Sequence, residues 1–204
     1  MSKTSYKKLK IIGDWSSDLK NYNPNFKRDF LEKAYADPTS SVWNNLEPTN
    51  RVHGAHDVLR NTRGWVEPET MPTFEKIRKM TGFDNCQLVI LKFEKYETHL
   101  IHRDKLPKYD LIERPGVDLK LNDWENLDHE RLLLMLNDRE PGQFMQMGDV
   151  MLNDWKAGDT FYYNGKEEPH SAGNCGTGTR WVLRITGKPT EKFRQFVEQN
   201  IHYV

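Results

Sequence analysis

From Asp84 onward, the sequence is dominated by short segments in which apolar and polar residues alternate, separated by turn residues. Such alternation is typical of β-strands, because successive side chains point to opposite faces of the backbone. No segment of helical periodicity separates consecutive strands, which argues against a parallel nucleotide-binding sheet. The pattern predicts a sandwich or barrel whose strands lie at residues 87–93, 98–104, 131–137, 159–163 and 180–186.

Helical segments flank this strand-rich part. Residues 26–36 and 73–80 are predicted to be short helices, the second ending at Gly82. Residues 190–201 are predicted to form a helix that begins with a threonine cap, Thr190. We expect this helix to pack on the outer face of a sheet. Its apolar stripe consists of Phe193, Phe196, Val197 and Ile201.

At 204 residues the chain is long enough for a single domain with a substantial core. We expect three parts within that domain. An extension of helices and loops covers residues 1–85, a β-rich core covers residues 86–187, and a C-terminal helix covers residues 188–204.

The composition excludes several classes of partner. Thirty basic and thirty acidic residues give a net charge of zero, so nucleic acid is not an expected partner. The sequence contains no apolar run of membrane-spanning length and no signal peptide, and we therefore expect a cytoplasmic protein without a membrane partner. The two cysteines, Cys86 and Cys175, lie far apart in the sequence and fit a reducing compartment.

The first candidate site is the string HLIHRD, which contains His102 and Asp104. In a strand these residues emerge on the same face, about 6–7 Å apart, which is chelating geometry. The pair alone is weak evidence. Multiplying the seven histidines by the acidic fraction of 30 in 204 residues gives about one His-x-Asp/Glu by chance.

A second element adds His170 and, ten positions later, Arg180 at the start of a strand. Two imidazoles and one carboxylate leave three coordination positions open, as iron(II) needs to bind a 2-oxo acid and dioxygen, although zinc or manganese would also fit. A nearby arginine favours iron, because its planar guanidinium can hold the far carboxylate of a dicarboxylic co-substrate.

Two strands carry arginine on the face opposite their aliphatic residues. Arg180 and Arg184 share one face of the segment 180–186, and a buried charge there would need a partner such as a bound carboxylate. A solvated arginine face on an ordinary strand is the alternative. Arg131 begins the non-aliphatic face of the segment 131–137 and could be a second carboxylate or substrate contact. The aromatic residues Trp155, Phe161 and Tyr163 are predicted to face the core or the sheet, and one or two could line a substrate pocket.

The order of His-x-Asp, a distant histidine and an arginine ten positions later resembles the iron(II)- and 2-oxoglutarate-dependent oxygenases. Four strings resemble the branch of that superfamily that contains aspartyl/asparaginyl β-hydroxylases and proline hydroxylases. They are HRD (102–104), RLLLMLND (131–138), AGDTFYYN (157–164), and HSAGN (170–174) followed by RWVLRI (180–185). The motifs span roughly residues 87–187, and their order and spacing are more specific than any one of them.

The resemblance implies a mainly β fold with flanking helices, an α+β chain whose core is a double-stranded β-helix of the jelly-roll or cupin-like type. The implied site consists of His102, Asp104 and His170 as catalytic iron(II) ligands, Arg180 as the 2-oxoglutarate anchor, and Arg131 and Asn174 in or near the site. Arg184 is the second candidate for the anchor, since other branches place this arginine further from the last histidine. The 26 residues between Asp104 and Arg131 are longer than the branch leads us to expect and are predicted to form a lid or a substrate-contacting loop.

The resemblance also implies an activity. We expect a dioxygenase that uses iron(II), 2-oxoglutarate and O2, with ascorbate as an in vitro reductant. It would hydroxylate an unactivated C–H bond of an amino-acid side chain in a peptide or protein, or of a free amino acid. Two alternatives stay open: a cupin-like barrel that binds a metal or sugar without redox turnover, and an interaction protein in which the triad is accidental. The sequence does not distinguish the substrates and leaves the oligomeric state open.

Overall fold

The computed structural model describes residues 6–24, 62–102, 130–164 and 168–204. The helix predicted at 26–36, the ligand Asp104 and the long segment between Asp104 and Arg131 up to residue 129 lie outside the described residues. Within the described ranges, no helix has the length and apolar character that a membrane span requires.

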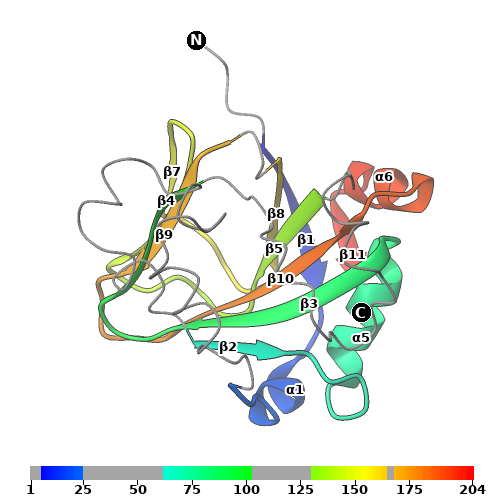
Figure 1. Cartoon of the computed structure of the whole chain (residues 1–204), viewed down its shortest axis with the longest axis horizontal. Helices are drawn as coiled ribbons and strands as arrows, with labels where there is room; N and C mark the ends of the chain where they lie inside the picture. The colour runs from blue at the N-terminus through cyan, green and yellow to red at the C-terminus, as the bar shows by residue number, and fades with distance from the viewer. Residues whose placement is uncertain (1–5, 25–61, 103–129, 165–167) are drawn as a thin grey trace, which may run out of the picture.

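The described strands form two sheets, with seven strands in the order β11-β1-β8-β5-β10-β3-β2 and four in the order β4-β9-β6-β7 (Figure 1). The larger sheet comprises β11 (Ile201–Tyr203), β1 (Tyr6–Ile12), β8 (Asp159–Tyr163), β5 (Glu130–Met135), β10 (Arg180–Lys188), β3 (Asp84–Phe93) and β2 (Thr62–Trp65). The smaller sheet comprises β4 (Glu97–His102), β9 (His170–Asn174), β6 (Gln143–Met147) and β7 (Val150–Leu152). The described pairings are antiparallel apart from β1 with β11.

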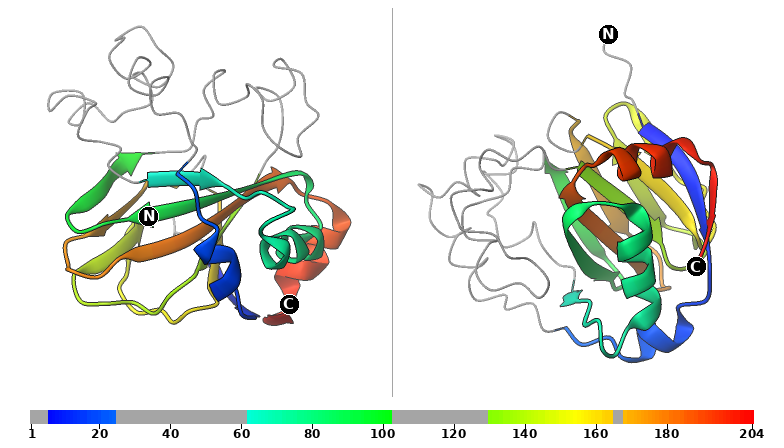
Figure 2. Two further views of the ribbon diagram at one scale, coloured as in Figure 1. Left: turned by 90° about the horizontal axis from the view of Figure 1, so that it is seen from below. Right: turned by 90° about the vertical axis from the view of Figure 1, so that its right-hand side faces the viewer.

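Helices cover one face of the larger sheet. Figure 2 shows α5 (Pro72–Thr81) and α6 (Glu191–Glu198) side by side on this face, with the short α1 (Ser16–Lys20) near the end of α5. The predicted helix at 73–80 is therefore confirmed as α5. It ends where Gly82 adopts a left-handed conformation with φ of 71°, which a residue without a Cβ adopts most easily.

Strand alternation divides the buried residues into two clusters. Leu132 and Leu134 of β5 pack with the helices in what we call the outer cluster, whereas Leu133 and Met135 pack between the two sheets in the inner cluster. β10 divides in the same way, since Leu183 belongs to the outer cluster and Val182 to the inner one. Burial of both faces explains why these central strands are so rich in aliphatic residues.

The C-terminal segment differs in part from its prediction. Thr190 caps α6, because its Oγ1 accepts a hydrogen bond from the Phe193 amide at 3.2 Å and its hydroxyl donates to the Gly82 carbonyl. The helix ends at Glu198, and Ile201, expected on the helical stripe, lies in β11 and is 51% exposed. The Lys10 amide bonds the Asn200 carbonyl at 2.8 Å, so pairing with β1 replaces the last helical turn.

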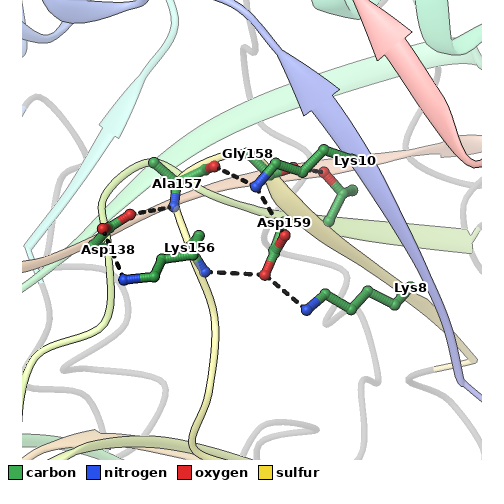
Figure 3. Close-up of polar contacts among 8 residues, drawn as sticks. Lys8, Lys10, Asp138, Lys156, Ala157, Gly158 and Asp159 are labelled. Carbon is green, nitrogen blue, oxygen red and sulfur yellow. Dashed lines mark hydrogen bonds and ion pairs between the residues drawn. The ribbon is translucent and has the colours of Figure 1, made fainter.

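The N-terminal segment also enters the sheet. β1 and β2 both belong to the larger sheet, although the sequence predicts only helices and loops over residues 1–85. Lys8 and Lys10 of β1 bind Asp159 of β8 at 2.7 and 3.0 Å (Figure 3). In the same network, Asp138 accepts a hydrogen bond from the Ala157 amide at 2.8 Å. The network holds the loop that leads into β8.

Candidate metal and carboxylate site

Two of the three predicted metal ligands lie opposite each other on neighbouring strands. His102 of β4 and His170 of β9 are Cα partners in the antiparallel ladder, after an irregularity in pairing that follows His99. Directly opposed residues have Cβ atoms about 4.5–5.5 Å apart, so the backbone alone brings these two positions within reach of one metal ion. The side chain of His102 and the whole of Asp104 lie outside the described residues.

His170 is held in an orientation suited to a metal ligand. It is 7% exposed, and its ring contacts that of Tyr163 edge to face with centroids 5.0 Å apart. Its Nδ1 lies 3.1 Å from the Glu168 carbonyl oxygen. A carbonyl can only accept, so this bond places the proton on Nδ1 and the lone pair of the neutral ring on Nε2, the tautomer that an Nε2 ligand requires.

In the described part of the chain, no three His, Cys, Asp or Glu side chains are grouped so that they could hold a metal. The predicted third ligand, Asp104, is not among the residues searched. The described residues fit an iron(II) site to the extent that the His170 imidazole lies on a strand position directly opposite the backbone of His102.

Arg180 begins β10 and turns into the interior between the sheets, where it is 1% exposed. Its Nη1 donates to the Phe144 carbonyl at 3.3 Å, and its Nη2 lies 3.7 Å from Met145 Sδ. The guanidinium carbon lies over the rings of Phe93 and Trp155, 5.0 and 5.1 Å from their centroids.

No carboxylate among the described residues pairs with Arg180, and its Nε has no hydrogen-bond partner there. Burial lowers the pKa of Arg180 to about 9, and Tyr163 acts in the opposite direction with a smaller effect. A buried charge without a counter-ion is costly, and the usual remedy is an anion held by paired hydrogen bonds. The guanidinium therefore fits a ligand carboxylate.

β6 relates this arginine to the histidine pair. Met147 is the Cα partner of His170 on the side opposite His102, and Met145, which Arg180 touches, lies two residues away on the same strand. Two residues of an extended strand span about 7 Å. The contact with Met145 therefore connects the guanidinium to the strand that pairs with His170.

The other two predicted arginines lie on central strands of the larger sheet, Arg131 on β5 and Arg184 on β10. Arg131 is buried, with its Nε 3.3 Å from Thr186 Oγ1, and it is the Cα partner of Tyr163. Arg184 is half-buried and pairs across the ladder with Leu133. Arg131 thus lies at the His170 end of the inner face, and Arg180 lies at the other end.

Asn174 supports the site through the backbone. It is fully buried, and its Nδ2 donates to the carbonyls of Phe93 and Gly178 at 3.0 and 2.5 Å. Its Oδ1 accepts from the Gly176 amide at 3.2 Å. These bonds hold the turn that immediately precedes Arg180, which makes Asn174 a positioning residue.

Trp155 contacts the predicted carboxylate anchor, although the sequence predicts no individual site role for it. This residue lies in the loop before β8, is 1% exposed, and its indole Nε1 has no hydrogen-bond partner within the described ranges. Nothing in the sequence distinguishes it from the other five tryptophans. Only its position against the Arg180 guanidinium identifies it.

Neither a protein-family model nor a curated protein matches the sequence. Solved structures match it by fold. A prolyl-4-hydroxylase from Pseudomonas putida superposes with a TM-score of 0.51 at 12% identity, over 92% of this chain and 94% of that one. A cupin 2 conserved barrel domain protein from Salinispora arenicola gives a TM-score of 0.37 at 10% identity, over 75% of this chain and 95% of that one.

These likenesses concern the fold alone. The prolyl-4-hydroxylase overlaps almost the entire length of both chains, whereas a TM-score of 0.37 is too low to establish a common fold. Together with the two sheets and the helices on one face, the comparison confirms the predicted architecture. The chain has a mainly β fold with flanking helices and a core of the double-stranded β-helix type.

Proposed function

We propose that this protein is a non-haem iron(II)- and 2-oxoglutarate-dependent dioxygenase that hydroxylates an amino-acid side chain, either in a peptide or protein or as a free amino acid. One observation carries the proposal. An arginine buried without a counter-ion among the described residues contacts Met145, two residues along β6 from Met147, which pairs with His170 opposite His102. This arrangement suits an acid that has one end on a metal and the other on a guanidinium.

In this proposal His102, Asp104 and His170 hold iron(II), and Arg180 binds the far carboxylate of 2-oxoglutarate. When bound, the iron centre supplies the oxidative chemistry that converts 2-oxoglutarate and O2 into succinate and carbon dioxide and inserts oxygen into a C–H bond. The Glu168 carbonyl keeps the proton of His170 on Nδ1. The apolar residues of the inner cluster exclude water from the co-substrate.

The resemblance in fold to a prolyl-4-hydroxylase supports the proposal without testing it, since one fold can serve many chemistries. The direct test is turnover without a prime substrate. Purified full-length protein with iron(II), ascorbate and 2-oxoglutarate is expected to form succinate slowly. Metal binding without binding of 2-oxoglutarate or formation of succinate would indicate a non-redox cupin-like barrel and contradict the proposal.

Two variants separate the roles of the ligands. His170→Gln is expected to lose metal binding, measured by elemental analysis after anaerobic loading with iron(II). Arg180→Met is expected to retain the metal and to weaken 2-oxoglutarate binding at least a hundredfold, because a charge-assisted bidentate contact is lost. Arg78→Met on α5, where Arg78 is half-buried and paired with Glu75 away from the inner cluster, is the control. Loss of 2-oxoglutarate binding in Arg184→Met but not in Arg180→Met would move the anchor to Arg184.

The substrate can be identified by mass. Incubation with free amino acids and with peptides is expected to give a product 16 mass units heavier in one class and not in the other. Dependence of that product on 2-oxoglutarate distinguishes enzymatic hydroxylation from adventitious oxidation by iron.

A further inference from the structure

Two side chains that contact each other in the inner cluster each carry a buried hydrogen-bond donor without an acceptor among the described residues. Trp155 Nε1 and Arg180 Nε each lack a partner among the described residues, and both side chains are 1% exposed. The guanidinium carbon lies 5.1 Å from the centroid of the indole ring that carries Nε1. The two unsatisfied donors therefore belong to one small region.

The chemistry of these donors limits what can satisfy them. An indole N–H and a guanidinium can donate but not accept, so neither can satisfy the other. A buried donor without an acceptor is destabilising, and a buried cation without an anion is more so. A water molecule could accept both hydrogen bonds but would leave the charge uncompensated. A carboxylate accepts at two oxygens and neutralises the charge.

The surrounding structure holds the indole in place. Trp155 immediately precedes the network of Lys156, Ala157 and Asp159 drawn in Figure 3, in which the Lys156 amide donates to Asp159 at 2.9 Å. The Trp155 carbonyl accepts a hydrogen bond from the Arg139 amide at 3.2 Å. With its backbone bound on both sides and its ring buried, the indole is preorganised as a donor at low entropic cost.

We propose that Trp155 Nε1 donates a second hydrogen bond to the carboxylate that Arg180 binds, so that Trp155 is a binding residue for the far end of the co-substrate. This inference rests on the proposed function, and it adds a basis for specificity. Trp155 and Arg180 together select dicarboxylic 2-oxo acids over monocarboxylic ones, because a ligand without the far carboxylate leaves both donors unsatisfied.

The test compares Trp155→Phe with the wild type, both as full-length protein loaded with manganese(II) in place of iron(II). Phenylalanine keeps an aromatic face for the guanidinium and removes only the N–H group. Calorimetry is expected to show 2-oxoglutarate and succinate bound about ten- to a hundredfold more weakly by the variant. The affinity for 2-oxobutyrate, which has no second carboxylate, is expected to stay unchanged. Trp181→Phe is the matched control, since Trp181 packs against the outer cluster.

Each result decides something. Equal affinity of Trp155→Phe and wild type for 2-oxoglutarate overturns the inference and leaves the proposed function intact, as does equal weakening for 2-oxoglutarate and 2-oxobutyrate. If the wild type binds succinate and Trp155→Phe binds it less well, but no succinate is formed from 2-oxoglutarate, the carboxylate site stands and the oxygenase proposal fails. A wild type that binds neither dicarboxylate overturns both.

Discussion

The outer and inner clusters are built from opposite faces of the same strands, yet they differ in how well their buried charged group is hydrogen-bonded. In the outer cluster Trp15 Nε1 donates to the Leu136 carbonyl at 2.8 Å, and the buried Asp18 accepts from the Phe74 amide at 2.8 Å. In the inner cluster Trp155 Nε1 and Arg180 Nε have no acceptor among the described residues. On the outer side His202 Nε2, whose ring stacks on Phe196, also has no hydrogen-bond partner within the described ranges, so what distinguishes the inner cluster is an unsatisfied donor on a cation.

This difference shows how one sheet serves two purposes. Alternation sends Leu183 outward and Arg180 inward from a single strand, so stability and binding can be changed separately. Substitutions on the outer face are expected to change the free energy of unfolding. Substitutions of Trp155 and Arg180 are expected to lower ligand affinity. They should either raise the free energy of unfolding or leave it unchanged.

The largest expected effect on stability is at Leu183, which is fully buried in the outer cluster. Leu183→Ala removes buried methyl groups and leaves a cavity, and is expected to lower the free energy of unfolding by about 2–5 kcal/mol. Urea denaturation followed by circular dichroism measures this, with the volume-conserving Leu183→Met as control. Unchanged stability in Leu183→Ala would contradict the division into two clusters.

Arg180→Met is expected to increase stability, in contrast to Leu183→Ala. Replacing an uncompensated buried charge by an apolar side chain should raise the free energy of unfolding of the ligand-free protein by about 1–3 kcal/mol. Addition of 2-oxoglutarate should then stabilise the wild type and not the variant in thermal melts, because only the wild type binds it. A ligand-free variant less stable than the wild type would show that Arg180 already has a favourable partner in the fold.

A smaller effect is expected where the two covering helices meet. Thr190→Ala removes the cap of α6 and the hydroxyl bond to the Gly82 carbonyl, and is expected to cost about 1 kcal/mol. Thr190→Ser keeps both bonds and serves as the control in the same denaturation experiment. Since Thr190 lies on the outer side, 2-oxoglutarate affinity should not change in either variant.

The smallest effect is expected from Asp159, whose carboxylate joins β1 to β8. Burial alone would raise the pKa of Asp159, but contacts with Lys8, the Lys156 amide and Lys10 lower it below its ordinary value. A lowered pKa in the folded state means that the stabilisation is present above about pH 4 and is lost as the pH falls through the folded pKa. Asp159→Asn should therefore flatten the acid side of the stability–pH curve. An unchanged slope would show that the lysines contribute nothing at this site.

Sequence reasoning succeeded where a strand or helix carries a strong pattern. The five predicted strands correspond to β3, β4, β5, β8 and β10, and α5 and the body of α6 lie where periodicity places them. It missed β1, β2, β6, β7, β9 and β11. β7 and β11 have only three residues each, and β9 has the sequence HSAGN, in which no apolar alternation is visible. These short strands exist because neighbouring strands supply hydrogen-bond partners, and sequence patterns do not record that.

The sequence alone predicts a β-rich unit with arginines on one face of its central strands and with His102 in one of them. It could not determine that Arg131 and Arg180 are buried while Arg184 is half-buried, because alternation assigns a face and gives no depth. Only the pairing of distant segments places His102 opposite His170, brings Arg180 into contact with Met145 of the strand beside His170, and packs Trp155 against the guanidinium. The physical reason is that register and burial depend on pairing between segments distant in sequence.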